Sequence, residues 1–184
     1  TFMATDFKNI KLTKNLKRKD CNIPEDAFVF CSFNKQYKIN PKIFKVWMSL
    51  LKKIKKSVLW LKFTNPDAEK NIVNEAIKQS IDPNRIIFAK NKKLEDHLSR
   101  YQIADLFLDT YPYGAHTTCV DSIWAGLPVI TIKGNTFVSR VSSSLLKSIG
   151  LEELITSSYK EYEDLAIFLT ENPKNLISIR NKLK

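Results

Sequence analysis

A polar segment between two apolar ones holds the residues of this chain best suited to bind an anion. Residues 104–108 form an apolar run typical of a buried strand, and Gly114 marks a turn after it. His116, Thr117 and Thr118 then open a helical pattern. The first N–H groups of a helix have no partner within it and carry partial positive charge. An imidazole and two hydroxyls at such a point favour binding of a phosphate.

Asp121 lies one turn into this helix, where its carboxylate can accept hydrogen bonds from a ribose. Two other interpretations stay open. Thr117 or Thr118 can simply cap the helix, a contribution of about 1 kcal/mol. Alternatively, His116, Cys119 and Asp121 can hold a metal ion, although a four-ligand site would also need His97 to converge. We expect no metal and no cofactor.

Two other loops supply cations. Lys35 and Lys38 follow the first predicted strand directly, where an ammonium can neutralise a phosphate and stabilise charge on a leaving group; the alternative is a pair of surface lysines. His97 and Arg100 share a predicted helix, and a guanidinium can stack on a base or clamp a phosphate. A semi-buried structural histidine is the alternative there. The chain contains no Gly-x-Gly-x-x-Gly fingerprint, which argues against a standard dinucleotide-binding fold.

The elements that position these residues alternate between strand and helix. Residues 1–26 are interpreted as a linker or a packing arm, and residues 27–184 as one Rossmann-like domain. Short strands that are apolar throughout predict a parallel sheet, so we expect a doubly wound α/β fold with helices on both faces. Ligands of such sheets bind beyond the carboxyl ends of the strands. Strands are expected at 27–33, 57–63, 85–89, 104–108, 128–132 and 154–155, and helices at 41–54, 68–77, 94–101, 117–125, 137–149, 159–169 and after 172–173.

Composition narrows the classes of function. The net charge is +11, but most of the basic residues are scattered lysines, and only five are arginines. Such a surface attracts a phosphorylated ligand, whereas nucleic-acid readers depend on arginine, so we expect no nucleic-acid partner. No apolar run is long enough to span a membrane. Three cysteines without paired spacing favour a reducing compartment, hence a cytoplasmic location.

Eight segments resemble, in order, the protein O-linked N-acetylglucosamine transferase family, which includes the SPINDLY-type enzymes. The similarity runs from about Phe28 to Leu169. The segments are FNKQYKINP (33–41), SVLWL (57–61), NRIIF (84–88), EDHLSR (95–100), ADLFLDT (104–110), HTTCVDSIWAGLP (116–128), SRV (139–141) and EYEDLA (161–166).

The resemblance implies a GT-B glycosyltransferase, in which two Rossmann-like lobes enclose the active site. This chain is similar to the C-terminal lobe, which binds the UDP-sugar donor of an inverting, metal-independent enzyme that transfers a sugar such as N-acetylglucosamine to protein side chains. The resemblance also implies residue roles. Lys38 would contact the diphosphate and support departure of UDP, His116, Thr117 and Thr118 would meet the phosphates, Asp121 would hold the ribose, and His97 and Arg100 would lie by the uracil and ribose.

The chain departs from the family pattern at several positions. The animal enzymes have glutamine in place of Lys35 and a donor-contacting lysine in place of Leu94, and Tyr113 and Gly114 differ in the loop nearest the sugar. The lysine-rich composition is typical of a bacterial protein. The family's N-terminal lobe and tetratricopeptide repeats, which reach the protein acceptor, lie outside this sequence, so we expect the isolated chain to be inactive. Two alternatives are a non-catalytic nucleotide-binding or scaffold module and a nucleic-acid binder.

Overall fold

Six parallel strands form one sheet in the computed structural model, which describes residues 10–13 and 16–183. The strand order is β3-β2-β1-β4-β5-β6, so the direction of winding reverses between β1 and β4. This is the doubly wound order in which ligands bind where the winding reverses, and it confirms the predicted fold class. The strands are β1 (Phe28–Ser32), β2 (Ser57–Leu61), β3 (Ile86–Phe88), β4 (Leu106–Leu108), β5 (Val129–Ile132) and β6 (Ile155–Thr156).

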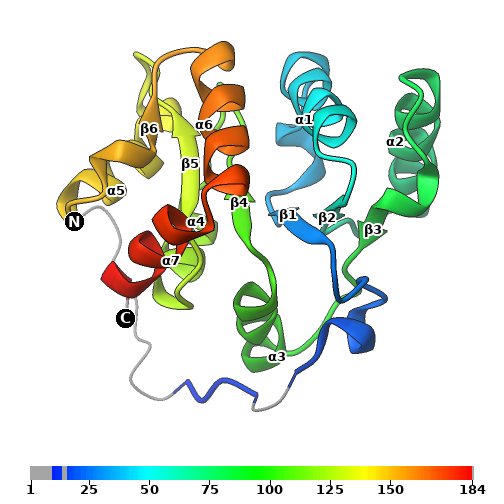
Figure 1. Ribbon diagram of the computed structural model, residues 1–184, viewed down its shortest axis with the longest axis horizontal. Helices are drawn as coiled ribbons and strands as arrows, with labels where there is room; N and C mark the ends of the chain where they lie inside the picture. Colours follow the sequence, from blue (N-terminus) through cyan, green and yellow to red (C-terminus); the bar gives the residue numbers. More distant parts are fainter. Residues whose placement is uncertain (1–9, 14–15, 184) are drawn as a thin grey trace.

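Helices cover both faces of this sheet. Figure 1 shows α1 and α6 on one side of the strands and α3 on the other. The helices are α1 (Pro41–Lys53), α2 (Pro66–Lys78), α3 (Leu94–Ser99), α4 (Thr117–Trp124), α5 (Val141–Ser148), α6 (Tyr159–Glu171) and α7 (Pro173–Lys182). Short 3-10 helices are η1 (Arg18–Cys21), η2 (Gln36–Lys38), η3 (Pro83–Arg85), η4 (Arg100–Ile103), η5 (Phe137–Ser139) and η6 (Glu152–Leu154).

The strands are apolar throughout because each one is buried on two sides. Along β1, Phe30 joins a core that includes Trp47 of α1 and Tyr162 of α6. Its neighbour Cys31 points to the opposite face and joins a core that includes Leu98 of α3. Successive side chains of a strand alternate between faces, so a sheet covered on both sides shows no polar alternation. None of the helices in the described residues is long and apolar enough to cross a membrane.

Two predicted helices are shorter than the sequence suggested. The helix expected at 137–149 is divided into η5 and α5, because Ser139 Oγ hydrogen-bonds to the backbone N–H and C=O of Thr136 at 3.1 Å and 2.9 Å. The helix expected at 94–101 changes to a 3-10 helix after Ser99, whose Oγ donates to Glu95 O at 2.6 Å. Hydroxyl side chains that bond to nearby backbone groups compete in this way with the regular helix.

The described part of the N-terminal segment packs against this same domain. Arg18 forms an ion pair with Asp105 at 2.7 Å and donates to the carbonyl of Ala27 at 2.7 Å. Ile23 is buried in the core beneath α3, and Thr13 N donates to Ser99 Oγ at 2.7 Å. Figure 1 shows this blue segment passing α3 on the side away from α1. The proposed domain start at residue 27 stays a prediction, and residues 1–9 and 14–15 lie outside the described residues.

Asn40 joins the start of α1 to the loop after β4. Its Oδ1 caps the helix by accepting from Lys42 N at 3.0 Å and Ile43 N at 3.1 Å, as the Asn-Pro pair predicted. Its Nδ2 donates to Tyr111 O at 2.5 Å. Asn65 caps α2 in the same way, with Oδ1 2.8 Å from Asp67 N.

Variants of these two cap residues distinguish the stability that comes from helix capping from the stability that comes from the bond between Asn40 and the loop. We expect Asn65→Ala to lower the free energy of unfolding by about 1 kcal/mol, the usual cost of a lost cap. Asn40→Ala should cost about 2 kcal/mol, because the carbonyl of Tyr111 also loses its donor. Urea denaturation followed by circular dichroism measures both. Equal losses would mean that the bond to Tyr111 contributes nothing to stability.

Candidate functional site

A buried carboxylate organises the loop that follows β4. Asp109 is 1% exposed, and its Oδ1 accepts hydrogen bonds from Thr110 N at 2.8 Å, Ala115 N at 2.7 Å and Asn34 Nδ2 at 3.1 Å. Its Oδ2 accepts from Thr131 Oγ1 of β5 at 2.8 Å. Burial raises the pKa of Asp109, and these hydrogen bonds oppose that shift. The carboxylate therefore ties the ends of β1, β4 and β5 to a single loop.

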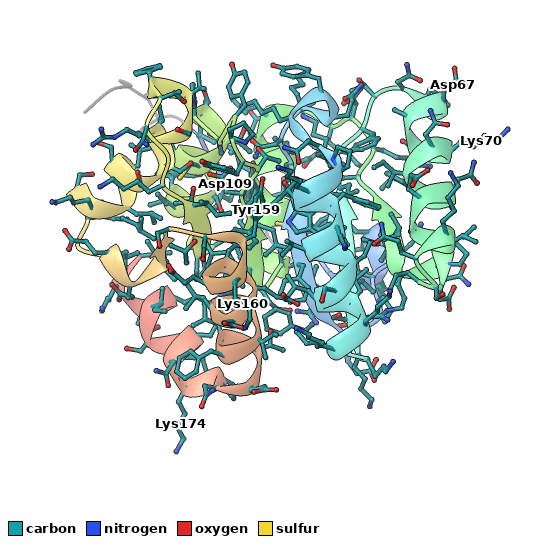
Figure 2. The ribbon with its side chains drawn as sticks, turned by 90° about the horizontal axis from the view of Figure 1, so that it is seen from above. Asp67, Lys70, Asp109, Tyr159, Lys160 and Lys174 are labelled. Carbon is teal, nitrogen blue, oxygen red and sulfur yellow. The ribbon has the colours of Figure 1, made fainter. Side chains whose placement is uncertain are left out.

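Further bonds fix the same loop to the helices. Tyr162 Oη of α6 donates to Asp109 O at 2.9 Å, and Ser142 Oγ of α5 donates to Ala115 O at 2.8 Å. Figure 2 shows Asp109 toward the middle of the molecule, whereas Asp67 and Lys70 lie at its rim on α2. A Cβ at Gly114 would lie 3.1 Å from Asp109 Oδ2, so the loop can approach the carboxylate this closely because residue 114 is a glycine.

The loop leads into α4 at the carboxyl edge of the sheet. Its N-cap residue is His116, with φ −115° and ψ −96°, and Thr117 is the first helical residue. The alternative in which Thr117 or Thr118 caps the helix is therefore wrong, since both lie inside the helix. The start of α4 thus places two hydroxyls and the first helical N–H groups at the point where the winding reverses.

Lys38 approaches this helix start from the loop after β1. Its Nζ donates to Gly114 O at 2.8 Å and lies 4.1 Å from the centroid of the Tyr113 ring. Burial lowers the pKa of Lys38, and Asp109 partly offsets that shift. Burial and then the charge of Lys38 lower the pKa of His116. The structure therefore brings the predicted Lys38 and His116 together.

Exposed aromatic rings border this pair. The His116 ring lies 5.6 Å from Tyr113 and 5.8 Å from Phe137, measured between centroids. Tyr37 lies 6.1 Å from Tyr113 and is 70% exposed. These rings make an apolar rim around Lys38 and His116. Sequence analysis did not select Phe137 or Tyr37, because a single aromatic residue in a loop carries no pattern.

His97 and Arg100 lie on the other side of β1. The His97 ring packs 5.5 Å from Phe33, and burial, followed by the charges of Lys62 and Arg100, lowers its pKa to about 4. Arg100 is 3% exposed and donates from Nη2 to the carbonyl of Lys90. His97 is therefore a neutral ring at neutral pH, held beside a buried guanidinium.

Buried polar atoms without a hydrogen-bond partner gather around these two side chains. Such atoms are rare in folded proteins, so a group of them suits a polar ligand such as a base. In the described part of the chain they include Trp60 Nε1, His97 Nδ1, Arg100 Nη1 and Tyr101 Oη. The rings of Trp60, His97 and Tyr101 all pack against Phe33.

The charge of Lys62, a residue that the sequence analysis missed, acts on Asp121. Burial raises the pKa of Asp121 to about 6, and the charge of Lys62 acts against that rise. Burial and then the nearby cations Lys35 and Arg100 lower the pKa of Lys62, whereas Asp121 raises it. The predicted strand ran to residue 63, whereas β2 ends at Leu61 and leaves Lys62 at the ligand edge. A strand end two residues earlier, at Leu61, was the signal that would have found it.

The predicted site residues thus form two neighbouring groups. Lys38, His116, Thr117 and Thr118 lie around the start of α4, and Lys35, His97, Arg100 and Asp121 lie around Lys62. Cys119 is different, because it is fully buried in the core beneath α4 and burial raises the pKa of its thiol. Among the described residues, no three His, Cys, Asp or Glu side chains converge as metal ligands, so the rival metal site is not assembled.

The model of glycosyl transferase family 41 matches residues 5–184. The chain belongs to this family. This match confirms the family that the eight ordered sequence segments indicated. The UDP-N-acetylglucosamine–peptide N-acetylglucosaminyltransferase of Caenorhabditis elegans is 36% identical over 166 residues, which cover 90% of this chain and 14% of that protein. A probable enzyme of the same name, SEC, from Arabidopsis thaliana is 36% identical over 169 residues, covering 91% and 17%. The chain therefore spans about a sixth of the length of these family 41 relatives.

Solved structures of the same fold include a bacterial member. An O-GlcNAc transferase mutant from Thermobaculum terrenum matches with a TM-score of 0.82 and 29% identity, covering 89% of this chain and 34% of that one. The C-terminal domain of a glycosyl transferase group 1 protein from Francisella tularensis matches with a TM-score of 0.71 and 15% identity, covering 98% and 94%. The second likeness shows the fold alone.

Folding shifts the pKa values of Asp121 and His97 in opposite directions. Folding raises the pKa of Asp121 from 3.8 to about 6, so the folded state binds this proton more tightly and stability falls as the pH rises through that window. Folding lowers the pKa of His97 from 6.5 to about 4, so the unfolded chain binds that proton more tightly and stability rises with pH. The two contributions nearly cancel in the intact protein.

Single variants should expose each contribution. Relative to the unaltered chain, Asp121→Asn should gain about 1 to 2 kcal/mol of unfolding free energy between about pH 4 and pH 7, after allowance for solvent screening. His97→Gln should lose a similar amount over the same interval. Urea unfolding at several pH values measures both, with Asp67→Asn as a control on the outer rim. Parallel pH profiles for the two site variants would contradict the assignment.

Proposed function

We propose that this chain is the donor-binding lobe of an inverting glycosyltransferase that takes a UDP-sugar and transfers a sugar such as N-acetylglucosamine to protein side chains. One observation carries the proposal. Lys38 and the start of α4 meet at the point where the sheet reverses its winding, and the Asp109 network holds both. A cation and a helix N-terminus at that point suit a diphosphate. The relatives whose printed names include UDP-N-acetylglucosamine support the nucleotide and the sugar.

This arrangement favours a reaction that is accelerated by electrostatic stabilisation of the leaving group. The bond between the sugar C1 and the β-phosphate oxygen breaks, and its electron pair stays on the diphosphate. Lys38, with His116, Thr117 and Thr118 at the helix start, stabilises that developing charge. An acceptor hydroxyl attacks C1 from the opposite face and passes its proton to a base outside this chain. Because the positive charge comes from the protein, the mechanism needs no metal ion.

The second group of residues suits the nucleoside. The neutral ring of His97 and the buried guanidinium of Arg100 offer a flat surface and a donor to the uracil. Asp121 accepts the ribose hydroxyls, and Lys35 adds positive charge at the exposed edge. The unpaired buried atoms near His97 and Arg100 support this placement, because a base presents several donors and acceptors.

The acceptor requires protein beyond this chain. The C. elegans and Arabidopsis relatives are about six times longer, and their names specify a peptide as the acceptor. We therefore assign acceptor binding and the general base to a further lobe, and we place the protein in the cytoplasm, where the three free cysteines suit a reducing environment. A second candidate is a non-catalytic nucleotide-binding module, which would retain the fold and lack a catalytic role for Lys38.

Nucleotide binding tests the proposal directly. Titration calorimetry should show that the isolated chain binds UDP. Lys38→Ala should weaken binding roughly tenfold to a hundredfold, because a charge-assisted hydrogen bond is lost. Thr117→Ala should cause a smaller loss, and Lys70→Ala on the rim should cause none. Unchanged affinity in both site variants would favour the non-catalytic module, and DNA or RNA binding that UDP fails to displace would favour a nucleic-acid binder.

Turnover separates donor binding from catalysis. We expect the isolated chain to transfer no sugar from UDP-N-acetylglucosamine to a peptide, because we assign the positioning of the acceptor against the bound donor to a further lobe. Mass spectrometry of the peptide and an assay for released UDP measure transfer and hydrolysis separately. Sugar transfer by this chain alone would show that a single lobe suffices.

A further inference from the structure

The ring of Tyr113 covers the ammonium of Lys38 beside the start of α4. Lys38 Nζ lies over this ring, 4.1 Å from its centroid, and donates at 2.8 Å to the carbonyl of Gly114, the next residue of the loop. The sequence marks Tyr113 only as a departure from the family pattern, and the proposed reaction gives its side chain no role. Two adjacent residues of the loop after β4 therefore contact the same ammonium, one through a ring face and one through a carbonyl.

Hydrogen bonds fix the backbone that carries this ring. The carbonyl of Tyr113 accepts from Thr110 Oγ1 at 2.7 Å, and Thr110 Oγ1 in turn accepts from Asn34 Nδ2 at 2.9 Å. On the other side of the ring, Gly114 N donates to Val138 O at 3.0 Å. None of these bonds uses the side chain of Tyr113, so they remain when that side chain is replaced. The loop therefore holds its shape before any ligand arrives.

The Tyr113 ring itself lies at the rim of the site. It is 38% exposed, and its centroid lies 5.6 Å from that of His116 and 6.1 Å from that of Tyr37. In the part of the chain that the structure describes, neither hydrophobic core includes Tyr113. Replacing this ring therefore removes contacts at the site and leaves the packing of the two cores in place.

A ring face and a carbonyl suit an ammonium that has lost part of its water. Lys38 is half-buried, and burial lowers its pKa. The face of an aromatic ring attracts a cation, and the attraction is stronger where the cation is partly desolvated. An ammonium has three N–H donors. The carbonyl of Gly114 takes one and the ring attracts another, which leaves a donor for an anion at the helix start.

We propose that Tyr113 is a positioning residue whose ring holds the ammonium of Lys38 at the start of α4, where it binds the diphosphate. This inference rests on the proposed function, which assigns the diphosphate to Lys38. A lysine side chain has several rotatable bonds, and ordering it when a ligand binds costs free energy. A ring that already holds the ammonium removes part of that cost. Tyr113 thus acts through Lys38, by its ring rather than by its hydroxyl.

Binding of UDP to the whole chain tests the role of the ring. In titration calorimetry, Tyr113→Leu should weaken binding about threefold to tenfold, because the cation–π contact is lost. Tyr113→Phe keeps the ring and should keep the affinity of the unaltered chain. Phe168→Leu removes an exposed ring of α6 and should also leave the affinity unchanged. Adding Tyr113→Leu to Lys38→Ala should cause little further loss, because the two residues act as one unit.

A spectroscopic signature tests the contact in the free protein. The ring current of an aromatic side chain moves the NMR resonances of protons above its face upfield. The Cε protons of Lys38 should therefore be shifted upfield in the unaltered chain and in Tyr113→Phe, and this shift should disappear in Tyr113→Leu. Circular dichroism checks that each variant is folded.

The outcomes distinguish this inference from the proposed function. Equal losses in Tyr113→Phe and Tyr113→Leu would assign the effect to the hydroxyl and overturn the role of the ring. Unchanged affinity in Tyr113→Leu, additive losses in the double variant, or no upfield shift in the unaltered chain would also overturn it, while UDP binding still supported the proposed function. If the unaltered chain bound no UDP, the proposed function would fail, and the role of Tyr113 toward a diphosphate would fail with it.

Discussion

The whole site depends on a carboxylate that has been removed from water. Asp109 sits at the end of the central strand β4, and a buried charge in that position is tolerated only when its oxygens are fully hydrogen-bonded. Its partners come from β1, β5 and the loop it anchors, so satisfying one carboxylate also fixes the geometry of three strand ends. Lys38 and His116 meet because they flank the two segments that Asp109 joins.

Much of this arrangement was predictable from the sequence because it follows from burial. Strands covered on both faces are short apolar runs, and helices begin at pairs such as Asn40-Pro41. Strand order then places Lys38, His97 and His116 at one edge without any knowledge of side-chain contacts. Asp109 belonged to the segment that drew attention first, yet no pattern in the sequence distinguishes a carboxylate that anchors a loop from one that binds a ligand.

What the sequence failed to predict depended on single residues at element ends. Lys62 was missed because β2 ends two residues before its predicted end, and the cap position of α4 is occupied by His116, where a threonine had been considered. The break before α5 came from Ser139, whose hydroxyl bonds to Thr136 rather than leaving the backbone to continue a helix. The exact ends of these elements are decided by local hydrogen bonds of about 1 kcal/mol each. The periodic pattern of apolar residues in the sequence carries no information about such bonds.

A chain of hydrogen bonds connects the interior helices to the rim of the site. Trp47 Nε1 donates to Tyr162 Oη at 3.4 Å, and Tyr162 Oη donates to Asp109 O. A loop held in this way is preorganised, so a ligand that binds it does not have to order it first. This half of the site is therefore a rigid template, and under the proposed function the donor meets a loop that is already in place.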